Sequence, residues 1–347
     1  MRYKLLGRSG LRVSELCLGT MTFGEEWGRG ASADESRQVF DAYVEAGGNF
    51  IDTANFYTGG TSERLVGEFV GSERDRFVIA TKYTLTMREG DPNAAGNHRK
   101  NLHQAVNGSL QRLGTDYIDL LWVHAWDGVT PVEEMMRALD DLVRAGKVLC
   151  VGVSDAPAWV VSEANTLAML RGWSPFCAMQ VEYSLVQRGI ERELLPYAQA
   201  RDLAVLPWSP LAQGVLTGKY NQGSETDAKR FSPEERDHPY LNEHNLRIAA
   251  EVVAVAAEVG ASPAQVALAW LRTQPGVVIP IVGARKVSQL TDNLKCTKVN
   301  LSEAQVQRLS EISKIDLGFP AEFLKRDFVR NIVFSGQQDR LDVHRSG

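Results

Sequence analysis

Two side chains that can hold or transfer a proton follow the apolar pair Phe50-Ile51 closely. Asp52 comes directly after this pair, and Tyr57 lies five residues further along the chain. The sequence Thr58-Gly59-Gly60 that follows Tyr57 favours a loop over a helix. An acid and a phenol are therefore expected to emerge together at the end of one strand.

Two further groups of this kind end the next two apolar runs. The run 77–81 ends in Lys82, and the run 118–123 ends in His124. Any one of these residues could be a chance surface residue beyond a strand. A parallel barrel, however, brings the carboxyl ends of its strands to one mouth, where catalytic groups lie. A charged lysine there is costly unless it is paired, and Asp52 is its natural partner.

Composition describes an ordinary globular protein. The chain has 347 residues, of which 44% are hydrophobic and 23% are charged. A net charge of -5 offers no basic surface for nucleic acid or acidic lipid. The first six residues lack the apolar core of a signal peptide, and no apolar run reaches the roughly 20 residues of a membrane span. We therefore expect a soluble, cytoplasmic protein without a nucleic-acid or membrane partner.

The four cysteines are scattered along the chain. Cys17, Cys150, Cys177 and Cys296 show neither metal-ligand nor redox spacing. We expect buried free thiols and no metal site.

Short apolar runs alternate with segments of helical period about eight times. The predicted strands cover residues 16–19, 49–52, 77–81, 118–123, 148–152, 177–181, 203–207 and 277–281. Two helix starts combine an N-cap hydroxyl, an adjacent proline and a Glu or Gln, at Thr130-Pro131-Val132-Glu133 and Ser262-Pro263-Ala264-Gln265. Gly47 and Gly146 are expected to end the helices that precede two strands.

Three segments lie outside this repeat. A short hairpin, residues 3–6 and 11–14, precedes the first barrel strand. Residues 209–240 are too long for a simple connection and are expected to form a lid or binding loop. The tail from Asp316 onward contains four phenylalanines and is expected to fold back over the barrel, with poor order from about residue 337.

The repeat favours a closed α/β fold, a (β/α)8 TIM barrel that forms a single domain over residues 1–347. The alternative is a doubly wound sheet, which would require a Gly-x-Gly-x-x-Gly turn after its first strand. Residues 16–24 do not supply this turn, and no Walker motif is present.

The chain resembles the aldo-keto reductase superfamily, whose members are (β/α)8 barrels that reduce carbonyl groups with a nicotinamide cofactor. The order and spacing of several motifs carry the resemblance: Gly47 to Tyr57, Ala80-Thr81-Lys82, Leu121-Trp122-Val123-His124, Gly152-Val153-Ser154, Met179-Gln180, Pro207-Trp208-Ser209-Pro210-Leu211 and Gly283 to Asn293. The blocks at 208–211 and 283–285 look most like the longer-chain branch, which includes the β subunits of potassium channels.

This resemblance implies a catalytic tetrad of Asp52, Tyr57, Lys82 and His124. In it Tyr57 would give a proton to the carbonyl oxygen as hydride transfer builds negative charge there. A free phenol titrates near pH ~10, and a nearby Lys82 ammonium is expected to lower that value. Asp52 would keep Lys82 charged, and His124 would orient the carbonyl oxygen.

The resemblance also implies which residues bind the cofactor: Gly19, Thr20, Met21, Asp52, Ser154, Asp155, Gln180, Trp208, Ser209, Pro210, Leu211, Gln213, Gly214, Lys219, Gly283, Arg285, Lys286, Gln289 and Asn293. Arg285 and Lys286 lie beside the start of a helix and suit a 2′-phosphate, so NADPH is expected in preference to NADH. The chain departs from the family at Asp155, where Asn is common, at Trp208, where many members have Tyr, and at Gln289, where some have Arg.

The expected substrate pocket is mostly apolar and aromatic. Its candidate lining residues are Met21, Phe23, Trp27, Phe56, Tyr83 and Trp126. They favour an aromatic aldehyde, or a ketone on a hydrophobic, polycyclic or sugar-like body. The chain could instead be a nucleotide-sensing regulatory subunit like the channel β subunits, although it has no long basic or amphipathic extension before the barrel. The sequence leaves the oligomeric state open.

Overall fold

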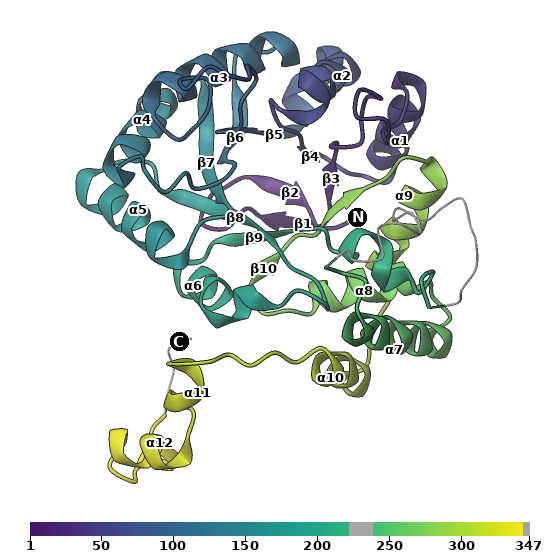
Figure 1. Ribbon diagram of the computed structural model, residues 1–347, viewed down its shortest axis with the longest axis vertical. Coiled ribbons are helices and arrows are strands. Elements are labelled where there is room, and N and C mark those ends of the chain that lie inside the picture. The colour runs from purple at the N-terminus through teal and green to yellow at the C-terminus, as the bar shows by residue number, and fades with distance from the viewer. Residues whose placement is uncertain (222–238, 343–347) are drawn as a thin grey trace.

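The computed structural model describes residues 1–221 and 239–342, and it shows the predicted (β/α)8 barrel (Figure 1). Nine strands form one parallel sheet in the order β10-β9-β8-β7-β6-β5-β4-β3-β11. Their bounds are β3 Cys17–Gly19, β4 Phe50–Asp52, β5 Val78–Tyr83, β6 Ile118–Val123, β7 Val148–Ser154, β8 Phe176–Glu182, β9 Ala204–Trp208, β10 Val277–Val278 and β11 Ile281–Gly283. The predicted strands agree with these to within a few residues.

The barrel closes through its eighth strand, which is broken into β10 and β11. The amide of Ile279 donates to Val205 O of β9, whereas Pro280 O accepts from the amide of Cys17 in β3. Pro280 has no amide hydrogen, so it interrupts the ladder where the strand changes partner. The eighth strand predicted at 277–281 therefore exists, but it extends to Gly283 with a break at residues 279–280.

Helices surround the sheet (Figure 1). Their bounds are α1 Ala33–Glu45, α2 Thr61–Val70, α3 Arg99–Leu113, α4 Val132–Arg144, α5 Ala158–Arg171, α6 Leu194–Arg201, α7 Glu243–Val259, α8 Pro263–Arg272, α9 Val287–Leu294, α10 Glu303–Ile312, α11 Ala321–Leu324 and α12 Asp327–Val333. The predicted start of α8 is confirmed, because Ser262 accepts from the Gln265 amide. The predicted cap of α4 is wrong: the Thr130 hydroxyl donates to Asp127, and Pro131 occupies the N-cap.

The predicted hairpin is present as β1 Tyr3–Leu5 and β2 Arg12–Ser14. Its turn lies against the barrel, since a Cβ at Gly7 would clash with the backbone oxygen of Cys177. Leu6 and Val13 are fully buried and pack in one cluster with barrel residues such as Phe50. The hairpin therefore covers the end of the barrel opposite the carboxyl ends of the strands.

The C-terminal tail does not fold back over the barrel as expected. Helices α11 and α12 extend away from it, below α6 in the view of Figure 1. Residues 222–238 of the expected lid, and residues 343–347 of the tail, lie outside the described residues.

The four cysteines are free thiols. Cys17, Cys177 and Cys296 are buried as predicted, whereas Cys150 is half-buried. Among the described helices, none has by itself the length and apolar composition of a membrane span. Helices α7 and α8 pass that test only as a pair, which is bent by 95°.

A buried carboxylate joins α2 and α3 to the strand that carries Lys82. Glu63 of α2 is fully buried, and its two oxygens accept from Thr81 Oγ1 of β5 at 2.5 Å and from Arg112 Nε of α3 at 2.6 Å. Thr81 precedes Lys82 directly, so this cluster fixes the end of β5.

We expect Arg112→Ala to lower the free energy of unfolding by about 3–5 kcal/mol, because it leaves the Glu63 carboxylate buried without its cation. Denaturant unfolding would measure the change. Arg37→Ala is the control, since Arg37 pairs with Asp41 in an exposed i, i+4 bridge worth about 0.3–0.5 kcal/mol. Equal effects of the two substitutions would contradict the role given to the buried cluster.

Candidate active site

Lys82 is the centre of the candidate site and is fully buried. Its ammonium donates three hydrogen bonds: to Asp52 Oδ2 at 2.5 Å, to Thr53 O at 2.8 Å and to Tyr57 Oη at 3.0 Å. An ammonium has three protons, so all of its donors are used. Three predicted tetrad members are therefore in direct contact.

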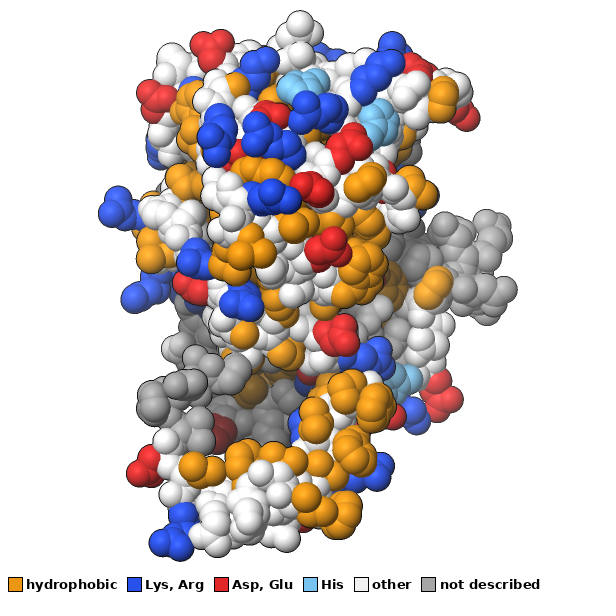
Figure 2. Space-filling model, turned by 90° about the vertical axis from the view of Figure 1, so that its left-hand side faces the viewer, with side chains coloured by type: hydrophobic (Ala, Val, Ile, Leu, Met, Phe, Trp, Pro, Cys, Tyr) orange, Lys and Arg blue, Asp and Glu red, His pale blue; other side chains and the backbone are white. Residues whose placement is uncertain are grey.

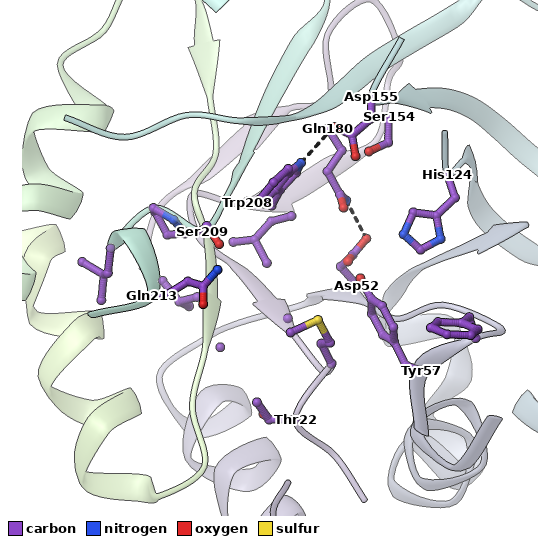
Figure 3. A pocket seen from close by; sticks show the side chains of 18 of the residues that line it. Thr22, Asp52, Tyr57, His124, Ser154, Asp155, Gln180, Trp208, Ser209 and Gln213 are labelled. Carbon is purple, nitrogen blue, oxygen red and sulfur yellow. Dashed lines mark hydrogen bonds between the residues drawn. The ribbon is translucent and has the colours of Figure 1, made fainter. Parts of the chain in front are cut away.

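Asp52 ends β4 and is held from both sides. Its second oxygen, Oδ1, accepts from Gln180 Nε2 of β8 at 2.8 Å, as the dashed line in Figure 3 shows. Its backbone carbonyl accepts from Thr20 Oγ1 at 3.0 Å. Thr20, a predicted cofactor-binding residue, is fully buried, and its hydroxyl fixes the backbone of Asp52.

Tyr57 begins the short helix η1, Tyr57–Gly60, in which Thr58 and Gly59 have left-handed backbone conformations. Burial raises the pKa of the Tyr57 phenol above its ordinary value of 10.0, although the Lys82 ammonium opposes this shift. The expected lowering by Lys82 is thus present, but desolvation outweighs it. At neutral pH Tyr57 is a protonated phenol.

Lys82 remains an ammonium despite its burial. Desolvation disfavours its charge, but the Asp52 carboxylate and Tyr57 more than offset this effect, so the pKa of Lys82 is raised. The ammonium also lies 4.6 Å from the centre of the Tyr57 ring. The arrangement is therefore a buried charge that directly contacts a neutral proton donor.

His124 follows β6 and faces Tyr57 edge to face, with ring centres 6.0 Å apart. Burial, together with the Lys82 charge, lowers the pKa of His124 to about 3. Its Nδ1 is buried and has no hydrogen-bond partner among the described residues. The imidazole is therefore neutral, and it can donate one hydrogen bond to a polar group in the mouth.

A cavity of about 490 Å³ opens between these side chains and the far end of the mouth (Figure 3). Predicted residues line most of it: Gly19, Met21, Trp27, Asp52, Phe56, Tyr57, His124, Ser154, Asp155, Gln180, Trp208, Ser209, Pro210, Leu211, Gln213, Gly214, Gly283 and Asn293. Lys82 lies beneath this surface and reaches it through Tyr57.

The loop after β9 is held in an uncommon backbone conformation. Ser209, Ala212 and Gln213 have φ between 47° and 53°, which non-glycine residues rarely adopt. Gly214, with φ 94°, lies against the Lys219 ammonium, since a Cβ there would be 2.9 Å from Lys219 Nζ. Strained backbone of this kind is concentrated at ligand sites. Ser209, Gln213 and Gly214 thus combine this backbone conformation with a place at the cavity.

Asp155 also has positive φ, 43°, and its Oδ1 accepts from Trp208 Nε1 at 3.1 Å (Figure 3). Burial raises the pKa of the Asp155 carboxyl. Two of the three residues at which this chain departs from its expected family, Asp155 and Trp208, are thus hydrogen-bonded to each other.

Arg285 lines a neighbouring cavity of about 450 Å³ that shares Met21, Thr22 and Trp27 with the first. Its amide donates to Gln289 Oε1 at 3.1 Å, so the Gln289 side chain folds back over the start of α9. Lys286 is the N-cap of that helix. These three predicted residues lie beside the main cavity, not in it.

Three predicted pocket residues do not line the main cavity. Phe23 and Tyr83 are fully buried, and Trp126 packs half-buried against the hydrophobic core. No sequence pattern separates these three residues from those that line the cavity, because an aromatic side chain near the end of a strand can point into the core or into the mouth. Five cavity residues were not predicted, and four of them are apolar: Thr22, Leu85, Leu268, Ile281 and Val282. In the described part of the chain, no group of His, Cys, Asp or Glu is placed to hold a metal ion.

Comparison with known proteins identifies the family of the chain. A family model described as "Aldo/keto reductase family" matches residues 15–314. The norsolorinic acid reductase of Emericella nidulans is 42% identical over 91% of this chain and 82% of its own length. The aryl-alcohol dehydrogenase [NADP(+)] of Phanerodontia chrysosporium is 39% identical over 90% of this chain and 85% of its own. The putative aryl-alcohol dehydrogenase of Saccharomyces cerevisiae is 35% identical over 94% and 90%. The chain belongs to the aldo/keto reductase family.

Proposed function

We propose that the protein is an NADPH-dependent reductase of aryl aldehydes and ketones, which runs in reverse as an alcohol dehydrogenase. The observation that carries this proposal is the hydrogen-bonded series Asp52, Lys82 and Tyr57, which ends in a protonated phenol at the edge of the cavity. When bound, the reduced nicotinamide supplies the hydride.

The residues that line the cavity fit a nicotinamide dinucleotide. Ser154 and Gln180 offer polar side chains for a carboxamide, and the Trp208 ring offers an aromatic face. Gly19, Gly214 and Gly283 let a ligand approach the backbone closely, and Lys219 lies beside Gly214 to bind a pyrophosphate. Asp155 binds Trp208 and would hold that ring in place.

Proton transfer is assigned to Tyr57. Its hydroxyl gives a proton to the carbonyl oxygen as negative charge develops there, and Lys82 stabilises the phenolate that results. Asp52 keeps Lys82 charged and directed. His124 is neutral and donates a hydrogen bond to the same oxygen, which places it within reach of Tyr57.

The preference for NADPH rests on two cations at the start of α9. Arg285 and Lys286 precede a helix N-terminus, where anions are stabilised, and a 2′-phosphate is such an anion. The name of the Phanerodontia relative includes NADP(+), which supports this assignment. Gln289 contributes a neutral side chain at this end, folded onto the Arg285 amide.

The substrate class rests on an aromatic pair above the proton donor. The Trp27 and Phe56 rings lie 5.5 Å apart, and Trp27 meets Tyr57 edge to face at 6.3 Å. Both rings line the cavity and are more than one-third exposed. A flat aryl carbonyl compound can stack on such rings. Relatives named aryl-alcohol dehydrogenase support the same class.

Tyr57→Phe should leave NADPH affinity nearly unchanged and lower kcat by about 10²–10⁴-fold, the usual effect of losing a general acid. NADPH consumption with a panel of aryl aldehydes, quinones, sugars and polycyclic ketones would measure it. Tyr197→Phe, which removes a hydroxyl that contacts Val161 O outside the cavity, is the matched control. Full activity of Tyr57→Phe would show that another group donates the proton. Tight NADPH binding without turnover of any compound would instead favour the regulatory alternative.

Arg285→Ala should raise the Kd of NADPH at least tenfold and leave that of NADH within about twofold, since the charge pair with the 2′-phosphate is the interaction removed. Cofactor titrations followed by protein fluorescence would give both constants. Arg29→Ala, at the other cation of the neighbouring cavity, is the comparison. Equal weakening of both cofactors by Arg285→Ala would place the phosphate elsewhere.

The pH profile of carbonyl reduction should be flat between pH 5 and 9. With a pKa of about 3, His124 is already neutral throughout this range, and the raised pKa of Tyr57 keeps its phenol protonated. Reduction needs the protonated phenol and should fall only above the pKa of Tyr57. Oxidation of the alcohol needs the phenolate and should rise with pH. An inflection of kcat near pH ~6.5 that disappears in His124→Gln would show that the imidazole titrates during reduction.

A further inference from the structure

The segment 317–342, which we call the C-terminal arm, presents an unusual amount of apolar surface. Eight large apolar side chains are between 38% and 85% exposed: Phe319, Phe323, Leu324, Phe328, Ile332, Val333, Phe334 and Leu341. In Figure 2 these hydrophobic side chains gather on the arm at the bottom of the molecule. Val329 is the one large apolar side chain in the arm that is buried.

The size of this surface matches an interface. Residues of this kind expose on the order of 150–200 Å² each when uncovered, so the arm offers roughly 800 Å². The largest apolar patch of a typical monomer is about 300–600 Å². Each partner in a standard protein interface contributes about 800 Å². The summed exposed apolar area of the arm is therefore comparable with one side of a stable complex.

The arm gains little support from its own barrel. Its attachment is Asp316, whose carbonyl accepts from Arg192 Nε and Nη2, and the hydrogen bonds described for residues 318–342 stay within the segment 316–342. Helices α11 and α12 have four and seven residues. Isolated helices shorter than about 12–15 residues are marginal in water, so packing against another surface must hold these two.

The same side of the molecule carries a second exposed apolar patch, on α5. This helix buries Val160, Val161 and Ala164 on its inner face, yet Trp159, Met169 and Leu170 are 51–78% exposed on its outer face. A surface helix normally has a polar outer face. Figure 1 places α5 and the arm on neighbouring sides of the barrel, and the view of Figure 2 faces both.

The charges of the two surfaces suit a contact between copies. The arm carries four basic and four acidic residues, and α5 carries Glu163 and Arg171, so each surface is neutral although the chain as a whole has a charge of -5. Neither surface would repel its counterpart on a second copy.

We propose that the protein is a homodimer in which the C-terminal arm of each copy packs on the outer face of α5 of the other. The exchange is reciprocal, so one two-fold axis covers both apolar patches of both copies and leaves none open for further growth. This assembly is independent of the proposed catalytic function, since neither surface contains a residue of the candidate active site.

The first test is the mass of the full chain at micromolar concentration, by light scattering after gel filtration. We expect twice the chain mass of 38.3 kDa. The arm variant Phe328→Ser/Ile332→Ser and the α5 variant Met169→Ser/Leu170→Ser should each halve this mass while keeping the circular dichroism and reductase activity of the parent. Val129→Ser, at an exposed apolar residue in the loop after β6, is the control and should remain dimeric.

A mixing experiment then tests which surface meets which. The arm variant has an intact α5 and the α5 variant has an intact arm, so an equimolar mixture restores one of the two contacts. We expect heterodimers in the mixture and monomers in each variant alone. A monomeric parent chain overturns the proposal, and so does an α5 variant that remains dimeric while the arm variant does not, because the arms would then pair with each other. A dimer that survives the arm substitutions overturns it as well.

Discussion

The mouth of this barrel depends on keeping one ammonium charged inside the protein. Burial alone would remove the charge of Lys82, and the Asp52 carboxylate at 2.5 Å prevents this. The remaining donors bind Thr53 O and Tyr57 Oη, so the ammonium joins β5 to the end of β4 and to the loop beyond it. Asp52 keeps Lys82 charged and also fixes its position, and Lys82 in turn positions the Tyr57 hydroxyl. The charge of this site and the position of its phenol therefore depend on the same hydrogen bonds.

Strands and loops contribute different groups to the candidate site. Asp52 and Lys82 are buried at the ends of their strands. Buried Glu63 accepts a hydrogen bond from Thr81, the residue before Lys82, and so fixes the end of β5. The proposed cofactor groups lie partly on strand ends, such as Ser154 and Trp208, and partly on loops with left-handed backbone, such as Asp155 and Ser209. A rigid centre suits proton transfer, which tolerates little displacement. Loops permit the close backbone approach that a long dinucleotide requires, at the cost of some local strain.

Much of the fold could be predicted from the sequence, because the spacing of apolar residues depends on which faces of the strands and helices are buried. The strand ends fixed where Asp52, Lys82 and His124 would lie, and the structure brings them together as the parallel topology requires. The direction of side chains beyond the strands could not be predicted. Phe23 is buried in the core, and the Thr130 hydroxyl donates to Asp127 and does not cap α4. The balance between desolvation and charge at Tyr57 also depends on atomic packing, which spacing does not encode. Nor does composition distinguish a tail that covers its own barrel from one that projects from it.

The broken eighth strand has a consequence for how the chain reaches its native state. Ring closure pairs Ile281 with Cys17 and Val277 with Ala204, so the first and seventh barrel strands both wait for a segment near the end of the sequence. Until residues 277–283 have left the ribosome, β3 and β9 are open edges that can pair with another chain. Contacts so distant in sequence are also slow to form. During synthesis, therefore, the barrel cannot close before this last strand is available.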